Sequence, residues 1–138
     1  MALICDTGPL YAAMDRADAD HQVCARLLSD SVEPLLVPAP VVVELDWLAG
    51  NRLRPEAFGA FLDDLADGAI AVVDLVRADY VRVGELLARY LDLKLGFVDA
   101  AVVAIVERLG EPKLATLDHR HFGAVRPRHV VALELLPA

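Results

Sequence analysis

Short apolar runs alternate along the chain with longer segments whose apolar residues recur every three or four positions. The short runs predict strands at residues 2–5, 35–37, 69–73, 114–117 and 130–135. The periodic segments predict helices at residues 8–14, 20–29, 41–49, 55–66, 79–90 and 98–109. This alternation predicts an α/β fold with a mainly parallel sheet that carries helices on both faces.

Composition narrows the class of protein. A chain of 138 residues is the size of a single domain, so residues 1–138 are expected to form one unit. With 57% hydrophobic and 25% charged residues, the chain is too apolar to be disordered. We expect part of this apolar surplus to lie on the surface and to contact a partner protein.

Three observations bear on location. No apolar run is long enough to span a bilayer, since the longest candidate, residues 98–106, contains Asp99. The N-terminus shows no basic segment followed by an apolar one, so no signal peptide is expected. Cys5 and Cys24 lie among apolar residues and are expected to be small core residues, not a disulfide framework. We therefore expect a cytoplasmic protein that does not contact a membrane.

Four acidic residues stand in unusual positions. Asp6 and Asp118 each follow a predicted strand, at the sheet edge where α/β proteins bind ligands. Glu44 and Asp99 lie on the apolar stripes of predicted helices, and no lysine or arginine shares either stripe. A buried carboxylate without a partner is costly, whereas a cluster of them suits Mg²⁺ or Mn²⁺. Such a metal can activate water and stabilise the charge that develops on a phosphate.

Three of the four acids also have a structural explanation. Asp6 could cap a helix, Asp99 could stabilise a helix N-terminus, and Asp118 could end its strand in a turn. Glu44 lies in the middle of its helix and has no such explanation. One shared site accounts for the whole set more simply.

The segments around these acids are residues 3–7 (LICDT), 40–45 (PVVVEL), 95–100 (LGFVDA) and 115–118 (ATLD). In this order they resemble the PIN-domain endoribonucleases, specifically the VapC-type toxins of type II toxin–antitoxin systems. The resemblance implies a PIN-like domain with a four- or five-stranded sheet, hydrolysis of RNA phosphodiester bonds with Mg²⁺ or Mn²⁺, and a homodimer neutralised by a small antitoxin. It also implies metal ligands and supporting hydroxyls at family positions: Asp6, Glu44, Asp99 and Asp118, with Thr7 and Thr116.

A net charge of −8 argues against bulk electrostatic attraction to nucleic acid. Basic residues gather only after Asp118, at His119, Arg120, His121, Arg126, Arg128 and His129. We expect His119 or Arg120 to contact RNA phosphate, with a solvated loop as the alternative. His119 and His121 do not indicate a zinc site, because no cysteine lies nearby.

Other functions remain to be weighed. Asp6, Thr7 and Gly8 match the aspartic-protease triplet, but that fold is all-β and this chain is rich in predicted helices. A haloacid-dehalogenase phosphatase needs an acid where Gly8 stands. The alternative left open is a PIN-like module that binds RNA or a protein without cutting, and a metal-dependent cleavage assay separates the two.

Overall fold

In the computed structural model, which describes all 138 residues, the strands form one parallel sheet in the order β3-β2-β1-β4-β5. The strands are β1 (Leu3–Cys5), β2 (Leu35–Pro38), β3 (Ile70–Val73), β4 (Lys113–Ala115) and β5 (Glu134–Leu136). Central β1 pairs with β2 on one side and with β4 on the other, so that Ile4 lies beside both Leu36 and Leu114. The expected parallel sheet is confirmed, with five strands.

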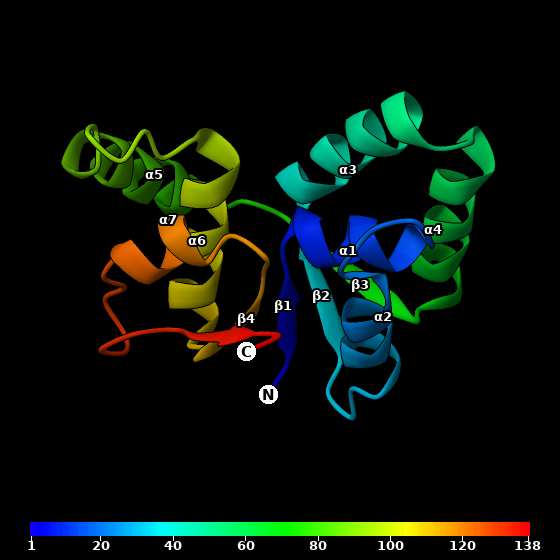
Figure 1. Cartoon of the computed structure of the whole chain (residues 1–138). Coiled ribbons are helices and arrows are strands. Elements are labelled where there is room, and N and C mark those ends of the chain that lie inside the picture. The colour runs from blue at the N-terminus through cyan, green and yellow to red at the C-terminus, as the bar shows by residue number, and fades with distance from the viewer.

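The helices form two groups on opposite faces of the sheet. They are α1 (Thr7–Met14), α2 (His21–Ser29), α3 (Ala39–Arg52), α4 (Pro55–Asp67), α5 (Arg77–Arg89), α6 (Phe97–Leu109) and α7 (His119–Ala124). In Figure 1, α1–α4 lie to the right of the strands and α5–α7 lie to the left. From β1 the chain first builds the sheet toward β3 and later toward β5, and right-handed crossovers then place the two helix groups on different faces.

The core lies around β1 and α6. Leu3, Ile4 and Cys5 are all buried, as expected for a strand covered on both faces. Every residue of α6 from Ala100 to Val106 is also buried, because this helix packs between the sheet and α5. Both cysteines are buried free thiols, as expected.

Several boundaries and faces differ from the sequence expectation. Helix α7 was not expected, because its six residues contain one buried apolar side chain, Phe122, and therefore no periodic stripe. The last strand is short: residues 134–136 pair with β4, while Val131 before them is 89% exposed. Val23 on α2 and Tyr80 on α5 are large hydrophobic side chains that lie exposed on their helices.

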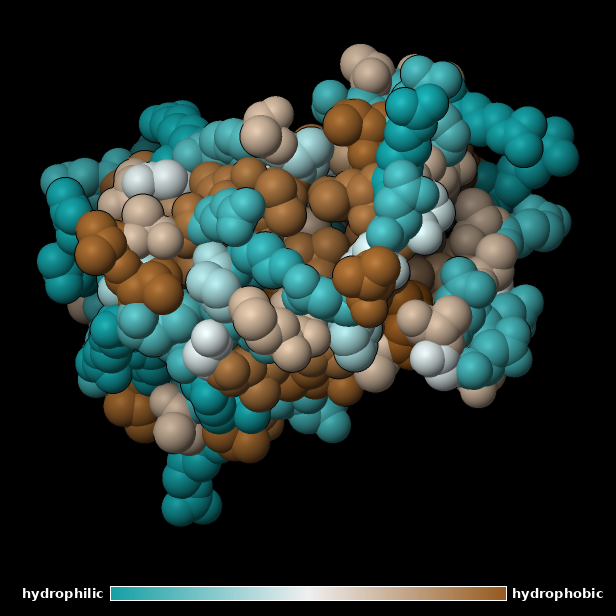
Figure 2. Space-filling view, turned by 90° about the horizontal axis from the view of Figure 1, so that it is seen from below, coloured by the Kyte–Doolittle hydropathy of each residue, from teal (hydrophilic) through white to brown (hydrophobic).

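Apolar side chains reach the surface on several elements. Figure 2, which views the molecule from below, shows several hydrophobic areas separated and bordered by hydrophilic side chains. Apolar side chains also line a groove of about 560 Å³, whose lining includes Pro40, Val43, Tyr80 and Phe97. Within it the rings of Tyr80 and Phe97 stack with centroids 6.4 Å apart. None of the helices is long and apolar enough to cross a membrane.

Candidate active site

The topology of the sheet determines the positions of two of the four acids, Asp6 and Asp118. β1 and β4 are neighbours, with Cys5 paired to Ala115, and Asp6 comes immediately after β1. The Asp6 backbone N–H donates to the Ala115 carbonyl at 2.8 Å, and this bond holds the carboxyl ends of β1 and β4 together. Asp118 follows β4 a few residues later. The strand order reverses at this point, which is where open α/β sheets bind ligands.

Helices from both faces complete the pocket. Glu44 comes from α3 and Asp99 from the first turn of α6, and with Asp6 and Asp118 they line a cavity of about 560 Å³. The lining is completed by Thr7, Gly8, Leu48, Leu117 and His121. The structure thus brings together all the acids that the sequence selected, and no lysine or arginine lines the pocket with them.

Thr116 links two of the acids. Its Oγ1 donates to Asp6 Oδ2 at 2.8 Å and accepts from the Asp118 backbone N–H at 3.0 Å. Thr116 is fully buried, so these bonds hold the Asp6 carboxylate and the start of the Asp118 turn in one geometry. Thr7 is also buried, but its Oγ1 has no hydrogen-bond partner. A buried hydroxyl without a protein partner is rare, and this one is free to bind a ligand or a water.

The carboxylates perturb one another. Burial raises the pKa of Asp6 to about 6; the Thr7 N–H and the Thr116 hydroxyl oppose this rise, and the charges of Glu44 and Asp118 add to it. Burial raises the pKa of Asp99 to about 7, and the charges of Asp6 and Asp118 contribute to the shift. Both pKa values are raised because the acids are buried close to one another without enough positive charge nearby. A divalent cation among them would favour their ionised forms.

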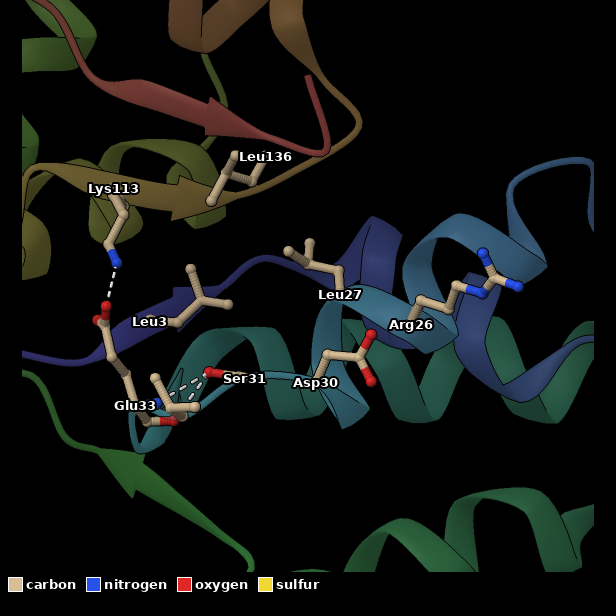
Figure 3. A pocket seen from close by; sticks show the side chains of 9 residues that line it. Leu3, Arg26, Leu27, Asp30, Ser31, Glu33, Lys113 and Leu136 are labelled. Atoms are coloured by element: carbon tan, nitrogen blue, oxygen red, sulfur yellow. Dashed lines mark hydrogen bonds and ion pairs between the residues drawn. The ribbon is translucent and has the colours of Figure 1, made fainter.

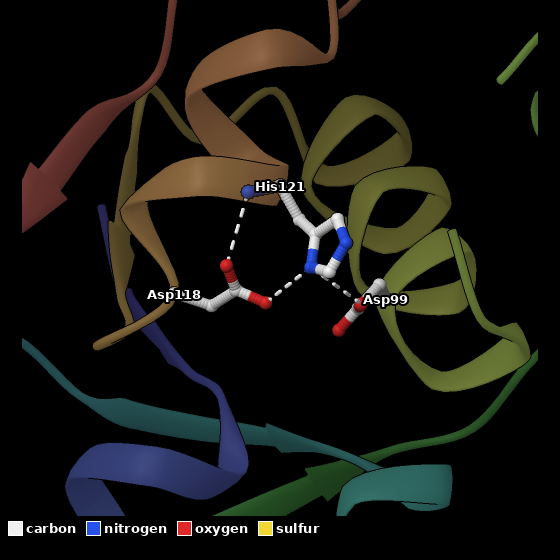
Figure 4. Close-up of side chains that lie close together, drawn as sticks. All are labelled: Asp99, Asp118 and His121. Atoms are coloured by element: carbon white, nitrogen blue, oxygen red, sulfur yellow. Dashed lines mark hydrogen bonds and ion pairs between the residues drawn. The ribbon is translucent and has the colours of Figure 1, made fainter. Parts of the chain in front are cut away.

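His121 is the one basic side chain that lines the pocket, and Figure 4 shows its ring beside Asp118 and Asp99. Its ring Nδ1 lies 2.6 Å from Asp118 Oδ2 and 3.8 Å from Asp99 Oδ2, and its backbone N–H donates to Asp118 Oδ1 at 3.0 Å. The bond to Asp118 raises the pKa of His121. Burial alone would raise the pKa of Asp118, but the hydrogen bonds from the His121 backbone and ring outweigh burial and lower it.

The donor set fits a hard divalent cation. Carboxylate oxygens are the preferred ligands of Mg²⁺ and Mn²⁺, and the unpartnered Thr7 hydroxyl supplies a further oxygen. Asp99, Asp118 and His121 each present a ligand atom, and these atoms lie within 4.8 Å of one another. The pocket can therefore hold a metal ion.

Helix capping accounts for only part of the set. Asp118 does cap α7, through the bond from the His121 N–H. Asp6 occupies the N-cap position of α1, yet its side chain makes no capping hydrogen bond. Asp99 lies in the first turn of α6, whereas Glu44 has no helix terminus nearby. Capping is thus a sufficient account of Asp118 alone.

The basic stretch does not form one patch, contrary to the sequence interpretation. His119 and Arg120 are exposed on α7, but Arg128 pairs with Glu85 at 2.5 Å on another surface, and the His129 ring contacts the Glu111 carbonyl. His121 points into the acidic pocket, a role that the sequence interpretation missed. Its position three residues after Asp118, the spacing between a helix cap and the N–H it binds, was the available signal.

A second pocket lies near the amino ends of β1 and β4 and has a different character. Its lining includes Leu3, Leu27 and Leu136 (Figure 3). The ammonium of Lys113 pairs there with the Glu33 carboxylate, so the cation is already neutralised. No cluster of acids gathers at this end of the sheet, so the candidate catalytic acids all lie in the acidic pocket.

Sequence comparison decides the family, because residues 3–126 match the PIN domain. The chain belongs to the PIN-domain family. It is 35% identical over 125 residues to Ribonuclease VapC26 of Mycobacterium tuberculosis, covering 91% of this chain and 93% of that protein.

Solved PIN structures share the fold. VapC20 of M. tuberculosis, described as a toxin that cleaves the sarcin–ricin loop, superposes with a TM-score of 0.83 at 22% identity, covering 94% of this chain and 99% of that one. A chain of VapBC2 from Rickettsia felis, solved with a promoter DNA fragment, gives a TM-score of 0.69 at 17% identity and covers 98% of this PIN domain and 97% of its own length. These likenesses confirm the α/β PIN fold.

Proposed function

We propose that this PIN domain is a metal-dependent endoribonuclease that hydrolyses RNA phosphodiester bonds, and that it is the toxin of a type II toxin–antitoxin system. The observation that carries the proposal is the convergence of Asp6, Glu44, Asp99 and Asp118 in one pocket without lysine or arginine. The identity to a ribonuclease over nearly the whole chain supports the same activity. We propose that it acts in the cytoplasm, where cellular RNA substrates are found.

Each of the site residues predicted from the sequence has a role in this proposal. Asp6, Glu44, Asp99 and Asp118 hold Mg²⁺ or Mn²⁺, which when bound supplies an activated water and neutralises charge on the phosphate. Thr116 fixes the Asp6 carboxylate through the 2.8 Å bond, and Thr7 offers its unpartnered hydroxyl to the metal's water or to substrate. Preorganised groups of this kind contribute most when they need no rearrangement during the reaction.

The experiment is incubation of the purified protein with total RNA and Mg²⁺ or Mn²⁺, with EDTA as the metal-free control. Asp6→Asn and Asp99→Asn should each reduce cleavage by at least about a hundredfold, the scale of losing one electrostatic element, while circular dichroism stays unchanged. Asp46→Asn, an exposed acid on α3, is the matched control and should cleave normally. If the protein binds RNA but shows no metal-dependent cleavage, the proposed activity is wrong and the protein is a PIN-like module that binds without cutting.

The exposed α7 residues His119 and Arg120 are proposed to contact RNA phosphate beside the pocket. Arg120→Ala should weaken RNA binding and reduce the dependence of log K on log salt by roughly one unit, because one phosphate contact is lost. Binding titrations at several salt concentrations measure this slope, and metal affinity should stay constant. An unchanged slope would make Arg120 an ordinary solvated residue.

The partners proposed are a second copy of the chain and a small antitoxin protein that covers the acidic pocket. Exposed apolar side chains support both, notably Val43 at 72% and Trp47 at 64% exposure on α3. Light scattering should show a homodimer, and a monomer at every concentration would refute it. Cleavage that persists when the product of the adjacent gene is added would refute inhibition by that protein.

A further inference from the structure

The hydrogen bond of the His121 ring to the Leu93 carbonyl sets which ring nitrogen faces the acids. Nε2 lies 3.1 Å from the Leu93 oxygen, and a carbonyl can only accept, so Nε2 carries a hydrogen. The other nitrogen lies within hydrogen-bond distance of the Asp118 carboxylate, so it also donates a hydrogen in the metal-free protein, and a metal ion that binds there would release this proton to solvent. That nitrogen, Nδ1, is the one that lies 3.8 Å from Asp99 and 2.6 Å from Asp118 (Figure 4).

This arrangement has the form of a protein metal ligand. Histidines that bind metal almost always donate their second ring N–H to a carboxylate or a backbone carbonyl, which fixes the tautomer and the ring orientation. The Leu93 carbonyl occupies that outer position here. The backbone N–H of His121 also holds Asp118 Oδ1, so ring and carboxylate are placed together by one short helix.

We propose that His121 Nδ1 is a direct ligand of the metal, sharing it with Asp99 and Asp118, and that this nitrogen makes the pocket prefer Mn²⁺ over Mg²⁺. The inference rests on the proposed metal site and adds a ligand to it. Carboxylates suit both ions, but Mg²⁺ takes oxygen ligands and keeps its waters, whereas Mn²⁺, as a first-row transition metal, accepts an imidazole nitrogen more readily. The contact with Asp118 in the metal-free protein keeps the ring at the ligand position.

Two variants separate ligation from simple positioning. His121→Asn keeps a side-chain donor near Asp118 but removes the imidazole lone pair, and His119→Asn alters an exposed histidine of the same helix. Calorimetric titration of His121→Asn should show Mn²⁺ affinity falling by at least about tenfold, the lower bound for loss of an outer-shell partner, with Mg²⁺ affinity nearly constant. His119→Asn should bind Mn²⁺ and Mg²⁺ with the affinities of the wild type. Equal losses for both ions would make His121 a positioning residue and overturn the proposal.

A spectroscopic measurement detects a nitrogen ligand directly. Pulsed electron paramagnetic resonance of the Mn²⁺-loaded protein should show coupling to a histidine ¹⁴N nucleus, which disappears in His121→Asn and persists in His119→Asn. Bound Mn²⁺ without nitrogen coupling would overturn the proposal and leave the ribonuclease assignment standing. Failure to bind either ion in calorimetry would overturn both.

Discussion

Two acid-rich regions of this PIN domain surround their buried carboxylates differently: one supplies arginine partners and the other does not. On the α5–α6 surface, Asp79 is 3% exposed and its carboxylate pairs with Arg108 at 3.0 Å. Glu107 accepts two bonds from Arg82, at 2.7 and 2.8 Å. Asp6 in the pocket is 6% exposed, about as buried as Asp79, and no arginine or lysine approaches it.

The pKa shifts record this difference. Burial tends to raise the pKa of Glu107, but the guanidinium of Arg82 and the Arg128 backbone N–H reverse the shift and lower it. In the pocket, burial dominates and raises the pKa of Asp6 to about 6. An arginine partner offsets the cost of burying a charged acid, whereas a buried acid without one destabilises the fold until a cation binds. The absence of a basic partner therefore separates a functional acid from a structural one better than burial does.

The largest expected contrast is the response to metal. A ligand that binds only the native state stabilises it by about 2.7 kcal/mol at a hundredfold excess over its Kd. Thermal melts with Mn²⁺ and with EDTA should show this gain in the wild type and a much smaller one in Asp99→Asn. Asp79→Asn should keep the full gain, although it starts from a lower melting temperature. An equal response in all three proteins would place the metal outside the acidic pocket.

The next contrast concerns the paired region. Asp79→Ala leaves the Arg108 guanidinium without its carboxylate and also removes the bond from the Val76 N–H to Asp79 Oδ2, at 3.0 Å. Breaking a buried pair costs about 3–5 kcal/mol, and solvent around the 31% exposed Arg108 side chain reduces this to about 2 kcal/mol. Urea unfolding measures the loss. A variant as stable as wild type would show that solvent already screens the pair.

The two regions differ in how well their residues could be predicted from the sequence. Asp6 and Asp118 were predictable, because each follows a strand of a parallel sheet whose carboxyl ends share one edge. The pairing of Arg82 with Glu107 was not, since the two residues lie on different helices and no local pattern relates them. Helix α7 was missed for a related reason: Asp118 and the packing of Phe122 stabilise it, whereas its own apolar pattern is too short to indicate a helix.

The smallest effect expected is also the one that tests the physical basis of the comparison. The pKa of Asp99 is about 7 in the native protein and near 3.8 when unfolded. Between about pH 4 and pH 7 the native state therefore holds a proton that the unfolded state has lost, so metal-free stability falls as pH rises through this window.

Asp99→Asn removes the titrating carboxyl group and with it this loss of stability at higher pH. In EDTA at pH 8 it should be more stable than wild type by about 1 kcal/mol, the scale of one pKa unit, because solvent screens a side chain that is 23% exposed. Urea unfolding at several pH values should show a shallower fall in the variant, whereas Asp46→Asn, the exposed acid on α3, should follow the wild type. If Asp99→Asn is instead less stable at pH 8, the carboxylate stabilises the N-terminus of α6 as a helix-terminus charge would. Asp99 would then belong with Asp79 among the structural acids, and the contrast between the two regions would fail at that residue.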